Sequence, residues 1–316
     1  MVLVSLTLLL VSILVLIKSA EYAITYASRL ARIFHISEFI VSFFFIAVMS
    51  CFPEAMVSIV SALEGTPEFG LGTLLGSNVA DLAMVFGVVA LFSKNGITVK
   101  SEILKSNFFY LILLLVPLLL GFDGNITRFD GLILIISGLL FFTTLLMQRK
   151  RFSRKFNHAE NLSWIANLVL LVVTIIALIG GAYYTVKFSV SFATEIGVPP
   201  FLIALTLVAI GTCMPELVFS IKAVTSNHSE LALGDILGNV IIDATILLGI
   251  VALIHPINFN PTYIYVTGGM MFFAGALLIY FLRSGRILTR QEGLYLLLFY
   301  IIYLILEIST SGILQK

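Results

Sequence analysis

The chain has 316 residues, of which 60% are hydrophobic and only 11% charged, with a mean hydropathy of +1.12 and a net charge of +1. A soluble domain this apolar could not cover its surface with polar groups, and the near-neutral charge excludes a basic nucleic-acid-binding protein. The sequence contains no GxGxxG or Walker-type phosphate loop. The composition therefore predicts an all-α, polytopic membrane protein that sits in a lipid bilayer.

Apolar runs long enough to cross the hydrocarbon core, which takes about 20 residues per helix, follow one another almost end to end. They predict ten transmembrane helices with approximate cores at Val2–Tyr26, Glu38–Ala62, Gly70–Phe92, Asn107–Gly121, Gly131–Met147, Ser163–Phe188, Pro200–Val224, Leu231–Ile254, Tyr263–Leu282 and Glu292–Ile308. The first run lacks a basic n-region and an obvious cleavage site, so we interpret it as a retained helix.

Basic residues gather in alternate loops. They follow the first, third, fifth, seventh and ninth spans, at Arg29, Arg32, Lys94, Lys100, Lys105, Arg149 to Lys155, Lys222, Arg283, Arg286 and Arg290, whereas the other loops carry mainly acidic residues. The positive-inside rule then places the basic loops in the cytoplasm and both termini outside the cell.

Two blocks of sequence recur at a fixed offset of 162 residues. AVMSCFPEAMVS (Ala47–Ser58) aligns with AIGTCMPELVFS (Ala209–Ser220), and GTLLGSNVADLAMVFG (Gly72–Gly87) aligns without a gap with GDILGNVIIDATILLG (Gly234–Gly249). Because each half contains five expected spans, the second half should enter the membrane with the opposite orientation. The sequence thus predicts an inverted-topology repeat, a common plan of secondary transporters, with residues 1–147 and 163–316 joined by a basic cytoplasmic linker at 148–162.

The repeated blocks concentrate oxygen donors, with residues three or four apart on one helical face. The candidate ligands are Glu54, Glu216, Asp81, Asp243, Ser50, Thr212, Ser77 and Asn239. Pro53 and Pro215 remove a backbone donor and distort their helices, which can free carbonyls such as those of Ala47 and Ala209 to face a cavity. An intramembrane carboxylate costs about 2.5–3.5 kcal/mol, and these helices offer no nearby lysine or arginine, so cations or protons must neutralise the acids.

Such a set of carboxylates, hydroxyls and carbonyls suits a hard cation, and flexible geometry favours Ca²⁺ over Mg²⁺. The two cysteines, Cys51 and Cys213, lie in apolar segments and indicate no disulfide framework. They are either small fillers or further ligands, and as ligands they would admit a softer metal. Asp235 is either a fifth acid of the site or a residue near its cytoplasmic mouth.

The two blocks resemble the α-repeats of the calcium/cation antiporter superfamily, especially the prokaryotic sodium/calcium exchangers. The resemblance implies a ten-helix fold with a cluster of ion sites, alternating access, no prosthetic group and function as a monomer. It also implies that the first and sixth helices slide across a rigid core. By match, Glu54 and Glu216 are the central Ca²⁺ ligands, and the other members of the site are the Ala47 and Ala209 carbonyls, Ser50, Thr212, Ser77, Asp81 and Asp243.

The sequence departs from this family pattern at the coupling-ion positions. Cysteine replaces a serine in both halves, Asn239 stands where a serine is expected, and Asp81 stands where asparagine is common. Fewer hydroxyls for Na⁺ and more titratable groups leave two hypotheses open. The first is an antiporter that exports Ca²⁺ in exchange for Na⁺; the alternative is a proton-coupled antiporter for Ca²⁺ or another divalent metal.

Two other classes were weighed. An intramembrane aspartyl protease needs a GxGD motif, for which the chain offers only ALGD (Ala232–Asp235). A passive cation channel usually builds its filter by oligomeric symmetry, whereas this single chain supplies both halves of a site. Both classes fit the sequence less well than a transporter.

Overall fold

The computed structural model describes residues 2–33, 50–93, 96–98, 107–147, 164–226, 229–284 and 287–310. The helices of the first half are α1 (Val2–Ile33), α3 (Phe52–Leu63), α4 (Pro67–Val79), the π-helical η2 (Ala80–Val85), α5 (Phe86–Phe92), α6 (Asn107–Leu120) and α7 (Arg128–Met147). Those of the second half are α8 (Trp164–Ile196), α9 (Pro200–Ile203), η5 (Ala204–Val208), α10 (Ala209–Thr212), α11 (Met214–Thr225), α12 (Ser229–Ile241), η6 (Ile242–Leu247), α13 (Leu248–Ile254), α14 (Pro261–Tyr263), η7 (Ile264–Gly268), α15 (Gly269–Ser284) and α16 (Arg290–Thr310).

Within the described ranges, seven helical stretches are long and apolar enough to cross a membrane, and two shorter apolar helices, Phe52–Leu63 and Phe109–Leu120, accompany them. The prediction of a polytopic all-α membrane protein is therefore confirmed. The expected second span is described only from Ser50 onward, and Ala47 lies outside the described residues. Two predicted helix ends were too early, because hydropathy marks depth in the bilayer and not helix length: α1 continues to Ile33 and α8 to Ile196.

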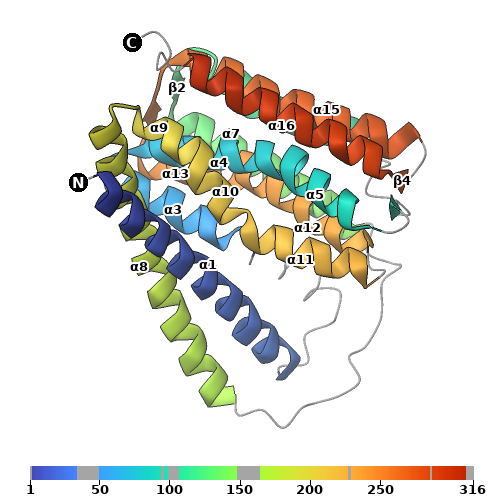
Figure 1. The fold of residues 1–316 in the computed structure, drawn as a ribbon, viewed down its shortest axis with the longest axis horizontal. Coiled ribbons are helices and arrows are strands. Elements are labelled where there is room, and N and C mark those ends of the chain that lie inside the picture. The colour runs from blue at the N-terminus through green and yellow to red at the C-terminus, as the bar shows by residue number, and fades with distance from the viewer. Residues whose placement is uncertain are drawn as a thin grey trace.

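The offset of 162 residues found in the sequence is also present in the secondary structure. The segments α3, α4, η2 and α5 begin and end 162 residues before α11, α12, η6 and α13, respectively. Two small antiparallel ribbons follow the same relationship: β1 (Ile97–Thr98) pairs with β4 (Ile287–Leu288), and β2 (Asn125–Ile126) pairs with β3 (Ile257–Asn258). Each ribbon thus joins the two halves, and Figure 1 places β2 and β4 at opposite ends of the bundle.

The repeat-equivalent helices α1 and α8 lie side by side along one flank of the bundle (Figure 1). Ser5 Oγ donates to Glu195 Oε1 at 2.8 Å, and Thr185 Oγ1 donates to Ser12 Oγ at 3.2 Å. Because residue numbers rise along one helix as they fall along the other, the pair is antiparallel. Both helices expose apolar side chains along much of their length, as expected of a lipid-facing pair.

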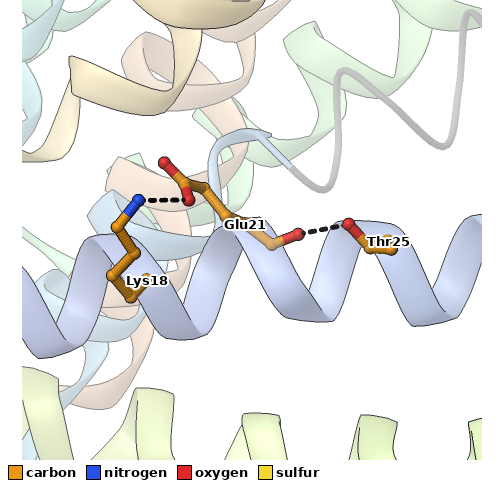
Figure 2. A network of polar contacts seen from close by, with 3 residues as sticks. All are labelled: Lys18, Glu21 and Thr25. Atoms are coloured by element: carbon orange, nitrogen blue, oxygen red, sulfur yellow. Dashed lines mark hydrogen bonds and ion pairs between the residues drawn. The ribbon is translucent and has the colours of Figure 1, made fainter.

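The apolar stretch of α1 ends at a polar group on its exposed side. Figure 2 shows Lys18 Nζ 2.7 Å from Glu21 Oε2, and Thr25 Oγ1 donating to the Glu21 carbonyl at 2.9 Å. The Lys18 and Glu21 side chains are 62% and 36% exposed, so this pair adds at most about 1 kcal/mol of stability. Its value lies in marking where α1 leaves the hydrocarbon, within a helix that is 32 residues long.

Two glycine crossings bring helices of opposite halves into backbone contact. A Cβ on Gly249 of α13 would lie 2.5 Å from the Gly131 carbonyl oxygen of α7, and one on Gly87 of α5 would lie 2.9 Å from the Gly293 carbonyl oxygen of α16. The two crossings are related by the 162-residue offset. Small residues at such points allow close helix approach inside a membrane, and here they clamp the helices that carry the candidate site.

Candidate cation-binding site

The two Pro-Glu motifs sit at equivalent helix breaks. Cys51 and Cys213 leave the regular helical pattern, with ψ of −2° and −1°, and are the N-caps of α3 and α11. Each new helix then carries its proline and its glutamate, Glu54 or Glu216, in the first turn. Because the N-terminal end of a helix has a partial positive charge, it stabilises a carboxylate there by about 0.3–1 kcal/mol, and more when partly buried. The breaks thus aim helix N-termini at the two glutamates.

The two aspartates lie in π-helical segments of the neighbouring helices. Asp81 is in η2 and Asp243 is in η6, and both are at most 2% exposed. A π-helical turn inserts one extra residue into a helix, disturbs its regular hydrogen bonds, and is found frequently at functional sites. The glutamates and the aspartates are therefore all carried on irregular backbone inside the bundle.

The cysteines connect the halves in a repeat-equivalent way. Cys213 Sγ donates to the Ser77 carbonyl oxygen at 3.6 Å, and Cys51 Sγ lies 4.0 Å from the Asn239 carbonyl oxygen. Each sulfur also lies within hydrogen-bonding reach of the aspartate on the opposite half, Cys213 with Asp81 and Cys51 with Asp243. Both cysteines are buried and free of disulfides.

Hydroxyl and amide groups extend these contacts, again mostly between halves. Ser77 Oγ donates to Asp243 Oδ2 at 3.0 Å, and the Thr212 side chain lies within hydrogen-bonding reach of Glu54. Asn239 Nδ2 donates to Glu216 Oε1 at 3.4 Å, and its Oδ1 lies 2.9 Å from Ser50 Oγ. Ten of the twelve residues predicted for the site are therefore side chains of one buried cluster.

The carboxylates of this cluster interact with one another without a basic partner. Glu54 and Asp81 interact electrostatically, both interact with Asp243 and Glu216, and Asp235 acts on Glu54, Asp81 and Glu216. In the part of the chain that the structure describes, no donor reaches Glu54 Oε2, Asp81 Oδ1, Glu216 Oε2 or Asp243 Oδ1. The ion pair found in the same ranges, Lys18–Glu21, lies on the exposed side of α1. Buried carboxylates in this arrangement need protons or cations as counter-charge.

A protein-family model described as "Sodium/calcium exchanger protein" matches residues 4–147 and again residues 166–309. The chain belongs to this family. Both ends of the second match lie 162 residues after those of the first, so the family signature follows the same repeat as the sequence blocks and the helices.

Individual relatives of this exchanger-family chain agree. The sodium/calcium exchanger MaX1 of Methanosarcina acetivorans is 25% identical over 350 residues, which cover 96% of this chain and 99% of MaX1. A relative from Alkalimonas amylolytica, CaxA, is 32% identical over 318 residues, which cover 95% of this chain and 98% of CaxA. A structure of the sodium-calcium exchanger NCX_Mj soaked with 2.5 mM Na⁺ and 10 mM Sr²⁺ has a TM-score of 0.67 and 25% identity, covering 96% of this chain and 98% of that one.

These relatives are transporters, and the protein is a membrane transporter and not an enzyme. Its ions are substrates, Ca²⁺ and Na⁺ in the family, and no prosthetic group takes part. Among the described residues, no three His, Cys, Asp or Glu side chains converge closely enough to hold a metal alone. An ion in this pocket must therefore draw on hydroxyl, amide and backbone oxygens as well.

One backbone expectation is corrected by the structure. The Ala209 carbonyl oxygen is not freed by the helix break: it accepts from the Cys213 backbone N–H at 3.1 Å and from Thr212 Oγ1 at 3.1 Å. The reason is register, because Pro215 removes the donor of the residue four earlier, Gly211, and leaves the donor to Ala209 in place.

The structure also places residues whose role the sequence left open or did not reveal. Asp235 is 4% exposed and accepts from Ser50 Oγ at 2.9 Å, so it joins the cluster. The buried Tyr110 and Tyr300 act electrostatically on Asp81, and among the described residues their hydroxyls have no hydrogen-bond partner. A further acid, Glu307, is buried in α16 but bonded to Thr267. Only Glu307 offered a sequence signal, as an acid inside the tenth apolar run.

Proposed function

We propose that the protein exports Ca²⁺ in exchange for Na⁺ by alternating access, with the acidic cluster as its transport pocket. The observation that carries the proposal is the set of contacts between halves that surrounds buried carboxylates lacking any basic partner. A pocket built from both halves can change its exposure when one half moves against the other, whereas a purely structural acid needs no such arrangement.

The chain as a whole is proposed to be a ten-helix inverted repeat, with halves 1–147 and 163–316 and a basic linker at 148–162. The antiparallel pairing of the equivalent helices α1 and α8 supports this, since equivalent helices that run in opposite directions belong to oppositely oriented halves. The exchanged pairing of β1–β4 and β2–β3 supports it as well. In such transporters the substrate site lies at the repeat interface near the midplane.

The proposed orientation has both termini outside and the basic loops in the cytoplasm. Arg283 and Arg290 flank β4, and Arg290 Nε donates to the Ser93 carbonyl oxygen at the end of α5. Asp123 and Asp130 flank β2 at the opposite end of the bundle (Figure 1). This separation of charge along the bundle supports the positive-inside assignment. We propose that the transporter works as a monomer, because one chain supplies both halves of the pocket.

Within the pocket, Glu54 and Glu216 are proposed as the central Ca²⁺ ligands, assisted by Ser50, Thr212 and Asn239. Ser77, Asp81 and Asp243 complete the ligand set, and the Ala47 and Ala209 carbonyls are proposed as backbone ligands. Ala209 can serve only if Thr212 turns its hydroxyl away from that carbonyl, because both lone pairs are now occupied. A role for Thr212 toward Glu54 and the ion is consistent with this exchange of partners.

Proton coupling is the second candidate. It is favoured by the number of acids, since Asp235 joins the four predicted carboxylates, and by the sulfur atoms of Cys51 and Cys213 at positions where hydroxyls would serve Na⁺. Neighbouring carboxylates disfavour one another's ionisation and can carry protons.

Reconstitution into proteoliposomes separates the two candidates. Ca²⁺ uptake is measured under an imposed Na⁺ gradient at uniform pH, and separately under a pH gradient without Na⁺. The proposal expects uptake driven by Na⁺. Uptake that follows the pH gradient and ignores Na⁺ would replace it with the proton-coupled exchanger, and Ca²⁺ movement driven by neither gradient would overturn both.

A further inference from the structure

The two cysteines are the feature of the pocket that Ca²⁺ transport does not require. They occupy repeat-equivalent positions at the N-caps of α3 and α11, and their exposures are 2% and 0%. Each sulfur faces the opposite half: Cys213 Sγ is 3.6 Å from the Ser77 carbonyl oxygen, and Cys51 Sγ is 4.0 Å from the Asn239 carbonyl oxygen. The same arrangement therefore occurs twice, once on each side of the pocket.

Each sulfur is accompanied by a carboxylate with spare capacity. Cys51 lies within hydrogen-bonding reach of Asp243, and Cys213 of Asp81. These aspartates are 1% and 2% exposed, and in the described part of the chain no donor reaches Asp243 Oδ1 or Asp81 Oδ1. A thiol, a carboxylate oxygen and a backbone carbonyl thus converge at two matched positions.

This donor set differs in kind from that of a Ca²⁺ site. Ca²⁺ takes oxygen ligands only, whereas thiolates select soft or borderline metals, and mixed sulfur and oxygen or nitrogen ligands suit Zn²⁺ and its chemical relatives. A buried cysteine that acts only as a small apolar filler would need neither the facing carboxylate nor its repetition in the other half.

We propose that the positions Cys51–Asp243 and Cys213–Asp81 bind a thiophilic divalent metal ion, such as Zn²⁺ or Cd²⁺, in competition with Ca²⁺. As the metal–sulfur bond forms, the thiol proton leaves to water, and the metal holds the thiolate. No oxidation or reduction takes place. The inference rests on the pocket of the proposed function, since it assigns that pocket a second class of cation.

The test uses the purified full-length protein in detergent with Cd²⁺ as the probe. Binding is followed by the ultraviolet charge-transfer absorption of cadmium thiolate, which reports sulfur ligation without any need for transport. C51S, C213S and the double variant are compared with wild type, with E307Q as a control that alters a buried acid outside the pocket. Thermal unfolding of each variant verifies that it is folded.

The proposal expects the absorption in wild type and E307Q, a reduction in each single variant and its loss in the double variant. Removal of both sulfurs should weaken Cd²⁺ binding by about tenfold or more, while Ca²⁺ binding changes little. Excess Ca²⁺ should suppress the band.

Absence of the band in folded wild type would overturn the proposal, as would equal Cd²⁺ affinity in the double variant. A band that excess Ca²⁺ leaves intact would place the sulfurs outside the cation pocket and would also overturn it. Failure of the proposed Ca²⁺/Na⁺ exchange is distinguishable, because it would leave the cadmium–sulfur band and its loss in the double variant unchanged.

Discussion

Ser77 Oγ donates a hydrogen bond of 3.0 Å to Asp243 Oδ2, although 166 residues separate the two in the chain. The bond ties α4 of the first half to η6 of the second. The repeat-equivalent of Ser77, Asn239, instead donates to Glu216 at 3.4 Å. The pocket is therefore assembled by symmetry but finished asymmetrically, so equivalent acids have different partners and their substitutions report different things.

Glu54→Gln and Glu216→Gln are each expected to reduce Ca²⁺ flux in proteoliposomes by about 100-fold or more, since groups that merely support a metal ligand already cost 10–100-fold in affinity. Glutamine keeps the volume and removes the charge. The matched control is Glu307→Gln, because Glu307 is equally buried at 3% exposure but accepts from Thr267, away from the pocket. Transport retained in both pocket variants would remove these glutamates from the centre of the mechanism.

Asp81→Asn should change the cation preference or flatten the pH dependence of Ca²⁺ flux. Protons compete with Ca²⁺ for carboxylates, so acidification lowers Ca²⁺ binding, and one acid fewer leaves fewer protons to compete. Initial rates are measured across pH with Ca²⁺ and with other divalent ions. Asp123→Asn serves as the control, because Asp123 is exposed and caps the Asn125 backbone N–H near β2. An ion and pH profile identical to wild type would contradict the role of Asp81.

Much of this pocket could be predicted from the sequence, because its parts are repeated in one ungapped register. Glu54 and Asp81 recur as Glu216 and Asp243 with identical spacing, and a repeat with an odd number of spans per half can meet itself only at an interface. The helix breaks also followed from local chemistry, since Pro53 and Pro215 each remove a backbone donor.

The remaining features depend on tertiary contacts that no local pattern carries. The π-helical turns η2 and η6 contain no proline or glycine to announce them. Asp235 could be assigned to the pocket only through Ser50, which lies 185 residues away in the chain. Tyr110 and Tyr300 resembled the other aromatic residues of apolar spans until folding placed them near Asp81.

Asp235→Asn is expected to raise the Ca²⁺ concentration for half-maximal flux by roughly tenfold, which corresponds to about 1.4 kcal/mol. Asparagine retains an oxygen for the Ser50 hydroxyl, now 2.9 Å away, but removes the negative charge from the cluster. A double-mutant cycle with Ser50→Ala should show a coupling above about 0.5 kcal/mol, as expected for residues in one hydrogen-bonded network. Strict additivity of the two substitutions would show that Asp235 acts independently of Ser50.

Gly249→Ala should destabilise the fold by about 1–3 kcal/mol, the usual cost of overpacking a filled interior. Its Cβ would lie 2.5 Å from the Gly131 carbonyl oxygen, and backbone cannot move aside as a flexible side chain can. Gly180→Ala is the matched control, because nothing lies within 4 Å of a Cβ at that position of α8. There the same substitution should stabilise by about 0.5–1 kcal/mol, since alanine loses less backbone entropy in a helix. Thermal unfolding in detergent measures both variants. A midpoint for Gly249→Ala at or above that of wild type would show that the α7–α13 crossing has slack and does not clamp the pocket.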